Sequence, residues 1–315
     1  MSDEDVTDSV LADDLIQPFR VDALNLHGRH VRLGNAVDTI LARHDYPAPV
    51  AILLGEALAL TAALAGALKF DGTFSTQVQG DGPVRLLLAD YATDGGLRGY
   101  AGFDKDKINA LATDPAPGTA GDAGLFGAGH LAFTVDQDGD HDRYQGLVPL
   151  EGDTLAGLAG LYLTRSEQLR ADVEVAATLW PGEAGQAPHW RAGCLLVQQA
   201  PTTDGRADDD ADRGESWDAA HTLFARLHRV DLADPLAIPP ALIGPLYRGH
   251  DVRLHESRPL RFACRCSAER AHHVITALGP EDRAELAVAG KLEMTCDYCN
   301  ALYLFDTDGQ PIEVE

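Results

Sequence analysis

The chain has 315 residues, of which 45% are hydrophobic and 23% charged, a composition that excludes a wholly disordered or fibrous protein. Its 25 Lys and Arg residues against 49 Asp and Glu give a formal net charge of −24. This charge predicts neither nucleic acid nor membrane as a partner, since phosphate and anionic lipid both select basic proteins. The acidic opening Met-Ser-Asp-Glu-Asp differs from a secretory signal, so we expect a cytoplasmic protein.

Residues 1–200 lack the regular strand–helix alternation of a doubly wound fold and predict an α+β domain. Residues 1–16 are expected to form an acidic tail, and residues 17–200 the N-terminal mixed domain of sheet and helix. Apolar periodicity predicts helices over residues 30–43 and from a cap at Asp153 to Leu169. Alternation and turn residues predict strands over residues 73–79, 84–88, 97–102, 130–135, 143–148, 173–179 and 194–199.

Residues 50–68 are apolar and long enough to span a membrane. Much of this segment is alanine, however, and it contains Glu56, which would be costly in hydrocarbon. We therefore expect a buried helix of a globular domain.

Residues 201–257 are predicted to be a linker. An acidic stretch containing a run of three aspartates from Asp208 comes first, followed by an amphipathic helix beginning near residue 216. One face of this helix is predicted to carry Ala220, Leu223, Phe224, Leu227 and Val230. Prolines then break an apolar segment that is too short to form its own core, so it should lie on the first domain.

Residues 258–315 are predicted to form a small α+β unit. A strand over residues 260–263, two helices between Ser267 and Gly290, and strands over residues 291–295 and 301–305 are expected. Four of the five cysteines lie here: Cys264, Cys266, Cys296 and Cys299. Two close pairs of thiols separated by a short insert are the spacing of a tetrahedral four-cysteine zinc site. Fewer than about 60 residues rarely fold without such help.

A structural zinc ribbon is the ordinary interpretation of this spacing, but one feature also permits a redox role. The first pair is Cys-x-Cys, and a disulfide between such close cysteines closes a tight, strained turn. Zinc-bound sulfurs are thiolates, which oxidants attack. Losing one pair to a disulfide would release the metal, so the sequence permits an unfolding switch operated by an oxidant.

Several motifs together resemble the redox-regulated 33-kDa heat-shock chaperone family. The C-terminal ones are Cys264-Arg-Cys-Ser-Ala-Glu-Arg270 and Cys296-Asp-Tyr-Cys299 before Tyr303-Leu-Phe305. The N-terminal ones are His44-Asp-Tyr-Pro47, Leu68-Lys-Phe-Asp-Gly72, Gln77-Val-Gln-Gly-Asp-Gly-Pro83, Tyr144-Gln-Gly146, Leu150-Glu-Gly-Asp-Thr-Leu155 and Arg165-Ser-Glu-Gln-Leu169. Asn300 stands where the family usually has glycine, and asparagine also tolerates a left-handed backbone.

The resemblance implies an ATP-independent holdase that is not an enzyme. In the reduced form Cys264, Cys266, Cys296 and Cys299 would bind one zinc ion per chain, and the protein would be inactive. Oxidation would form the Cys264–Cys266 and Cys296–Cys299 disulfides, release zinc and unfold the C-terminal redox-switch domain and the linker. The N-terminal domain would then bind unfolding client proteins, and the active form would be a homodimer.

Two other functions remain open at this point, a zinc-ribbon nucleic-acid module and a thiol oxidoreductase. Cys194, in an apolar strand pattern, is expected to be an inert buried thiol. His272 and His273 are expected at a helix surface and not as zinc ligands. Turn and cap roles account for Asp45 and Asp153, and we find no predicted partner for Glu56 or Glu151.

Overall fold

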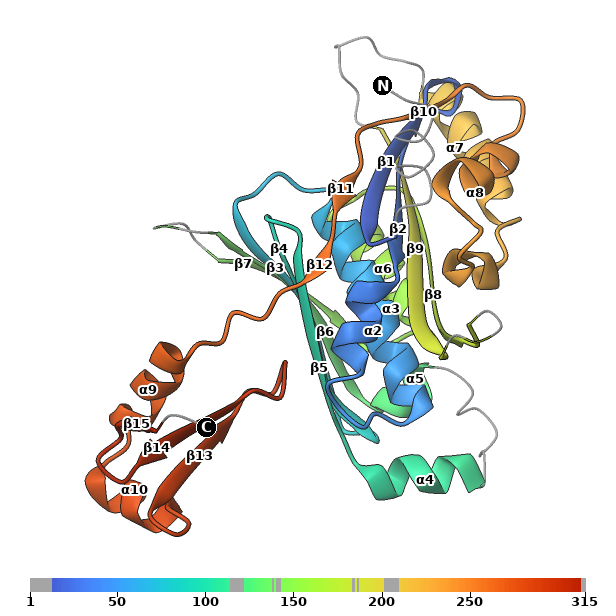
Figure 1. The fold of residues 1–315 in the computed structure, drawn as a ribbon. Coiled ribbons are helices and arrows are strands. Elements are labelled where there is room, and N and C mark those ends of the chain that lie inside the picture. Colours follow the sequence, from blue (N-terminus) through green and yellow to red (C-terminus); the bar gives the residue numbers. More distant parts are fainter. Residues whose placement is uncertain are drawn as a thin grey trace, which may run out of the picture. The chain divides into compact units, whose positions relative to one another are not determined.

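A computed structural model describes residues 13–312 except 114–121, 138, 140–142, 183–184, 186 and 201–209. The acidic tail through residue 12 and the first two aspartates of the Asp208 run lie outside the described residues. The chain divides into two units, Met1–Phe262 and Ala263–Glu315, which we call the first and second units and describe separately (Figure 1).

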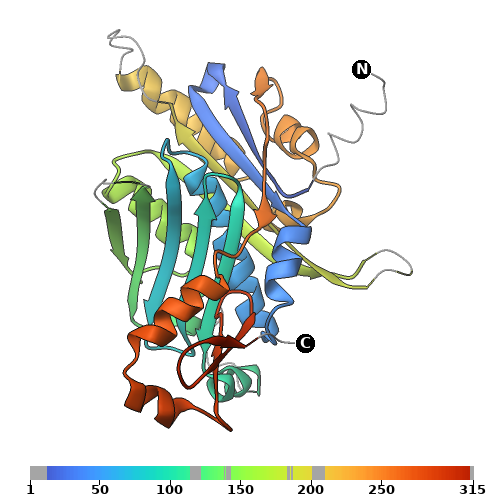
Figure 2. The same ribbon diagram turned by 60° about the vertical axis from the view of Figure 1, so that its left-hand side comes forward.

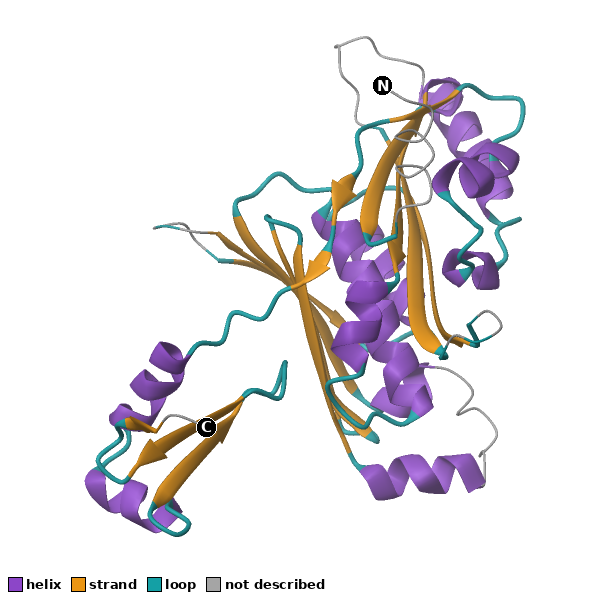
Figure 3. Cartoon of the chain, in the orientation of Figure 1, coloured by secondary structure: helices purple, strands orange, loops and turns teal. Residues whose placement is uncertain are grey.

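Two sheets form the first unit (Figure 3). The first sheet has the order β10-β1-β2-β9-β8, with β11 also paired to β1. Its strands are β1 (Leu15–Val21), β2 (Leu26–Leu33), β8 (Ala171–Trp180), β9 (His189–Gln199), β10 (Val252–Leu254) and β11 (Arg258–Pro259). The second sheet has the order β12-β5-β4-β3-β6-β7. Its strands are β3 (Gly72–Gly80), β4 (Val84–Ala92), β5 (Gly96–Phe103), β6 (Gly129–Gln137), β7 (Tyr144–Pro149) and β12 (Arg261–Phe262).

The apolar helix α3 (Ala48–Ala65) lies between the two sheets (Figures 1 and 2). By length and composition it could cross a membrane, yet 83% of it is buried inside the first unit, as expected for a core helix. Burial on all sides explains why the sequence is apolar around the whole helix. The other elements of this region are η1 (Asp22–Leu24), α2 (Asn35–Leu41), α4 (Lys105–Thr113), α5 (Asp122–Phe126) and α6 (Leu155–Arg165).

The predicted linker covers the other face of the first sheet. It contains α7 (Asp210–Phe224), η2 (Arg229–Ala233) and α8 (Pro239–Leu246). Both faces of strand β9 are buried. Cys194 and Leu196 belong to the core around α3, whereas Leu195 and Val197 belong to a separate cluster with the linker. A strand covered on both faces has a continuous apolar run, which the sequence shows here.

The last strands of the first unit come from the end of the predicted linker and from the residues that follow it. β10 and β11 pair with β1, and β12 pairs in parallel with β5. Both sheets are therefore completed at one edge by residues 252–262.

The second unit is small. It contains α9 (Ala268–Ala277), α10 (Pro280–Leu286) and a sheet of β13 (Lys291–Thr295), β14 (Leu302–Asp306) and β15 (Pro311–Ile312). Among its described residues, the buried apolar cluster comprises Ala271, Ile275, Leu292 and Phe305. Few small domains are stable on so little buried surface.

The α+β class is confirmed, and several details of the predictions are wrong. Leu15 and Ile16, placed in the tail, belong to β1, where Ile16 is fully buried. Residues 30–33 are the end of β2 and not helix, because a strand followed directly by α2 presents apolar residues at mixed spacing. Thr154 caps α6 in place of Asp153, its hydroxyl accepting from the Gly157 amide at 3.0 Å.

Other differences concern the linker and the boundary after it. The first linker helix begins at Asp210 and not near residue 216. Val230, assigned to the buried face of the linker helix, lies in η2 and is 76% exposed. The strand predicted over residues 260–263 pairs with β5 of the first unit, so the boundary falls after Phe262 and not before Arg258.

Candidate metal centre

Two turns of the second unit carry the four clustered cysteines. Cys264 and Cys266 precede α9, whose first turn is capped by the Ser267 hydroxyl, which accepts from the Arg270 amide at 3.1 Å. Cys296 and Cys299 lie in the turn between β13 and β14, which pair with each other. Short-range capping at one turn and strand pairing at the other therefore fix where the sulfurs point.

The second turn is closed by two backbone hydrogen bonds. The Asn300 amide donates to the Cys296 carbonyl at 2.8 Å, and the Cys296 amide donates to the Ala301 carbonyl at 2.9 Å. Asn300 has a φ of 59°, which lies in the left-handed region. Asparagine adopts this conformation more readily than most residues, so it can replace glycine here.

The four sulfurs converge. All lie within 4.8 Å of one another. The Cys264–Cys266, Cys264–Cys296 and Cys266–Cys299 Sγ distances are 3.4, 3.7 and 3.3 Å. Zinc–sulfur bonds of about 2.3 Å in a tetrahedron place neighbouring sulfurs about 3.8 Å apart. The four residues therefore fit a tetrahedral dication. The Sγ distances within and between the two close cysteine pairs are similar, so they do not indicate which sulfurs would form disulfides.

The electrostatics of the cluster also call for a cation. Burial, followed by hydrogen bonds with the other three thiols, raises the pKa of Cys299. Four thiolates so close together would repel one another strongly, and a bound dication removes that cost. Thiolate donors in tetrahedral arrangement select zinc over harder ions.

Tyr303 is a neighbour of the cluster that spacing does not reveal. Its hydroxyl donates to the Cys266 sulfur at 3.1 Å. Strand β14 places it there, opposite Met294 in the β13–β14 ladder. A hydrogen bond of this kind orients a metal ligand and reduces the charge on its sulfur.

The remaining candidate residues are not members of this cysteine cluster. Cys194 is fully buried in β9, and burial raises its pKa, as expected of an inert thiol. His272 Nδ1 contacts the Gly309 carbonyl at 2.8 Å, and its ring stacks on Phe305, so it serves the small core. His221 Nδ1 contacts Asp172 at 2.9 Å.

Glu56 does have a partner, contrary to expectation. It is 1% exposed within α3, and its carboxylate accepts from the Arg229 guanidinium of η2. The two residues are 173 positions apart, and no local pattern connects them.

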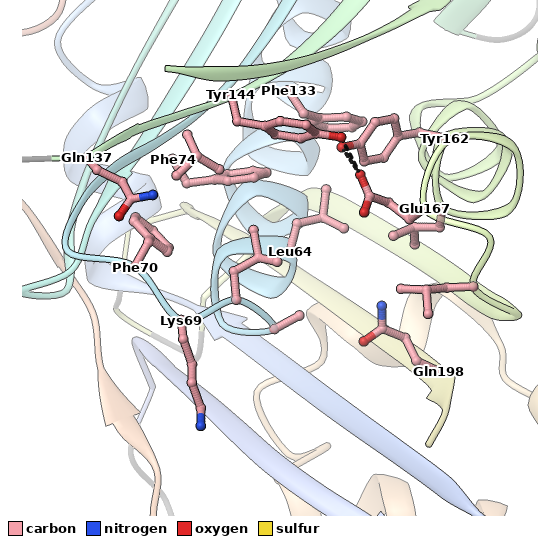
Figure 4. Close-up of a pocket in the computed structure, with 15 residues that line it drawn as sticks. Leu64, Lys69, Phe70, Phe74, Phe133, Gln137, Tyr144, Tyr162, Glu167 and Gln198 are labelled. Carbon is pink, nitrogen blue, oxygen red and sulfur yellow. Dashed lines mark hydrogen bonds between the residues drawn. The ribbon is translucent and has the colours of Figure 1, made fainter. Parts of the chain in front are cut away.

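The first unit also holds a cavity of about 310 Å³ that the sequence did not predict (Figure 4). Aromatic side chains line it, and the Tyr144 and Tyr162 hydroxyls both donate to Glu167 Oε1, at 2.9 and 2.5 Å. The lining residues come from six separate elements and two loops, so only the tertiary structure brings them together.

Comparison with known proteins identifies the family of the chain. The family model described as "Hsp33 protein" matches residues 14–306 of the chain. This chain belongs to the Hsp33 family.

Individual relatives match over nearly their whole length. The 33 kDa chaperonin of Caulobacter vibrioides strain NA1000 is 40% identical over 304 residues, 96% of this chain and 98% of that protein. The 33 kDa chaperonin of Pseudomonas putida strain F1 is 35% identical over 295 residues, 93% of this chain and 91% of that protein. The crystal structure of the 33 kDa chaperonin from Thermotoga maritima has a TM-score of 0.75 at 20% identity, covering 94% of this chain and 96% of that one, and so shares the fold of this Hsp33-family chain.

Proposed function

We propose that this Hsp33-family chain is an ATP-independent holdase that oxidation activates, and that it acts as a cytoplasmic chaperone and not as an enzyme. Its relatives are named 33 kDa chaperonins. The observation that carries the proposal is the second unit, in which four converging thiols lie beside a buried core of four described apolar residues. Such a unit depends for its folding on the state of its cysteines.

In the resting state Cys264, Cys266, Cys296 and Cys299 hold one zinc ion per chain. Structural zinc contributes about 10–16 kcal/mol of folding free energy to small units of this kind. Ile275, Leu292 and Phe305 contribute about 1.5–3 kcal/mol each and Ala271 less, and the entropy of ordering some fifty residues largely offsets this gain. Zinc binding therefore decides whether the second unit is folded.

Peroxide is a suitable oxidant for the switch. The two zinc-bound thiolates of Cys264 and Cys266, one H₂O₂ and two protons from solvent give one disulfide and two water molecules, and Cys296 and Cys299 react in the same way. The sulfur pairs lose two electrons each, and the zinc ion loses its four ligands and leaves. The pairing within each close cysteine pair comes from the family resemblance, and peptide mapping by mass spectrometry tests it.

Loss of the second unit would then free the linker. Residues that the linker buries on the first sheet include Phe19, Val21, Leu195 and Val197. Uncovering such a surface would create an apolar patch of the kind that binds other proteins. We propose that this patch binds unfolding clients and that the oxidised protein is a homodimer.

The decisive experiment follows zinc, structure and activity in one sample. The reduced protein should contain one zinc per chain and should not suppress light scattering by a chemically unfolded client. Peroxide should release the zinc, abolish hydrogen-exchange protection after residue 201 and produce suppression without ATP. Cys194→Ala should behave as the wild type. Suppression that requires no zinc release, or zinc release that yields no suppression, would contradict the proposal.

A further inference from the structure

One short segment of the linker lies directly on the first sheet, and we call residues 229–235 the linker strap. Gly193 of β9 shows how close the contact is: a Cβ atom there would lie 2.1 Å from the Leu232 carbonyl oxygen. The strap also buries Leu232, which is 2% exposed. The linker strap therefore packs closely against the first sheet at Gly193.

Two buried arginines bind the backbone of the strap. Arg191 Nε donates to the Ala233 carbonyl at 3.1 Å, and Arg32 Nη2 donates to the Pro235 carbonyl at 2.8 Å. Asp13 orients both guanidinium groups through ion pairs of 2.7 Å. Carbonyl groups are present in every peptide, so this part of the contact is independent of the strap's sequence.

A third contact depends on the side chain. Arg229 donates to the Glu56 carboxylate and, at 2.8 Å, to the Val175 carbonyl. Glu174 Oε1 lies 3.9 Å from Arg229 Nε. Glu56 is 1% exposed whereas Arg229 is 45% exposed, so the cation reaches a buried acid from the surface. A carboxylate at that depth is strongly destabilising without a cation.

Beside this ion pair the surface continues as a groove. The groove has a volume of about 510 Å³ and is lined by Glu56 and Arg229 together with Ile52, Leu179, Trp180 and Val230. Leu179 is 50% exposed, so apolar surface is available next to the acid. The linker strap fills only one side of a site that combines apolar walls with a buried negative charge.

We propose that the linker strap occupies a client site, and that client segments with the same chemistry bind there when the strap leaves. The preferred segment carries an arginine or lysine for Glu56 and an aliphatic residue three positions later, and Arg32 and Arg191 bind its carbonyl groups. This inference rests on the proposed function, because it requires that the linker undocks. The net charge of −24 also favours the approach of basic segments.

The test uses the full-length oxidised, zinc-free protein and fluorescent peptides. The first peptide has the sequence of residues 227–237, and the second replaces only the residue equivalent to Arg229 by norleucine. A charged hydrogen-bonded contact corresponds to about a 10- to 100-fold difference in affinity. We expect the arginine peptide to bind tighter by that factor in fluorescence anisotropy and to compete with an unfolded client.

Glu56→Gln is the matched variant, since it keeps the shape of the side chain and removes its charge. It should bring the two peptides to within about threefold of each other while the binding of the norleucine peptide is maintained. Asp90→Asn, which removes a buried carboxylate of β4 that pairs with Arg98 at 2.7 Å, should leave the preference intact. Circular dichroism identifies a variant that does not fold. In that case the test is whether the arginine peptide competes with an unfolded client for oxidised wild type more strongly than the norleucine peptide does.

The outcomes separate this inference from the function on which it rests. Oxidised wild type that suppresses client aggregation yet binds both peptides equally would overturn the inference alone. A preference that survives Glu56→Gln would overturn the assignment of the cation to Glu56. Oxidised protein that releases zinc but suppresses no aggregation would overturn both the inference and the proposed function.

Discussion

Replacing Phe224 by aspartate should release the linker of the reduced, zinc-loaded protein without any oxidant. Phe224 is the last residue of α7 and is 8% exposed, in the cluster that joins the linker to the first sheet. Ala220 is fully buried on the same helix, and Trp217, Leu223 and Leu227 pack there in part. The substitution puts a carboxylate at the centre of this contact.

The loss of free energy follows from the burial. Removing a buried phenylalanine from this contact costs about 1.5–3 kcal/mol, and a desolvated carboxylate without a cation adds several more. We expect a total of about 4–6 kcal/mol. The polar contacts that remain include the hydrogen bonds from Gln199 Nε2 to the Arg213 carbonyl at 2.7 Å and from Arg213 Nη2 to the Ala200 carbonyl at 3.2 Å, and the contact of His221 Nδ1 with Asp172 at 2.9 Å. Each such hydrogen bond contributes about 1 kcal/mol. A helix of 15 residues that loses its docking contacts is marginal in water and should unfold.

Hydrogen exchange and light scattering measure the two consequences. Protection of residues 213–224 should fall by about a thousandfold or more, and the reduced variant should suppress client aggregation at full zinc content. Ala219→Asp, which adds the same charge on the exposed face of α7, is the control and should change neither. Undocking without suppression would refute the idea that the linker covers the client surface. Unchanged protection would refute the energetic argument.

Three further predictions concern single residues. Burial, with the charge of Arg32, lowers the pKa of His30 from 6.5 to about 3, so the folded state binds fewer protons than the unfolded state, and stability falls as the pH drops below 6.5. Denaturant titrations should show a loss of about 2 kcal/mol from pH 7.5 to pH 5, and His30→Gln should lack this loss. Tyr303→Phe removes the hydrogen bond to Cys266 and should weaken zinc binding about tenfold in chelator competition. Cys194 should resist iodoacetamide in the folded protein before and after peroxide treatment, because it is buried and its pKa is raised.

Each of these has a contradicting result. If the stability of His30→Gln depends on pH as that of wild type does, His30 is not the cause of the acid sensitivity. Both ring nitrogens of His30 lack hydrogen-bond partners among the described residues. Unchanged zinc affinity in Tyr303→Phe would mean that the hydroxyl does not support the cluster. Labelling of Cys194 in folded protein would show that β9 opens locally.

The metal centre could be predicted because its information is local. The spacing of Cys264, Cys266, Cys296 and Cys299 predicts that the four thiols lie together and could hold a metal ion, and the capping signal at Ser267 is equally local. Tyr303 could not be found in this way, because its role depends on the register of β14 against β13.

The contacts of the linker could not be predicted from the sequence, because they also join residues that are far apart in the chain. The amphipathic pattern identifies Phe224 and Ala220 as buried, but it cannot say which surface they meet. The contact between Glu56 and Arg229 joins the buried helix α3 to the short helix η2, which is far away in the sequence. A single acidic residue in an apolar segment does not show from the sequence which cation it pairs with. Residues 30–33 were misassigned because apolar spacing alone does not separate the end of a strand from the start of the helix that follows.

The late strands of the first unit have a consequence for synthesis on the ribosome. β1 meets its partners β10 and β11 across more than 230 residues of chain, since Phe19 pairs with Leu254 and Leu15 with Pro259. A nascent chain that has emerged only as far as β9 has neither its edge strands nor the segment that covers its apolar face. Contacts of such high sequence separation form slowly. Each newly made molecule should therefore pass through a stage, before residue 262 leaves the exit tunnel, in which it is itself an aggregation-prone polypeptide.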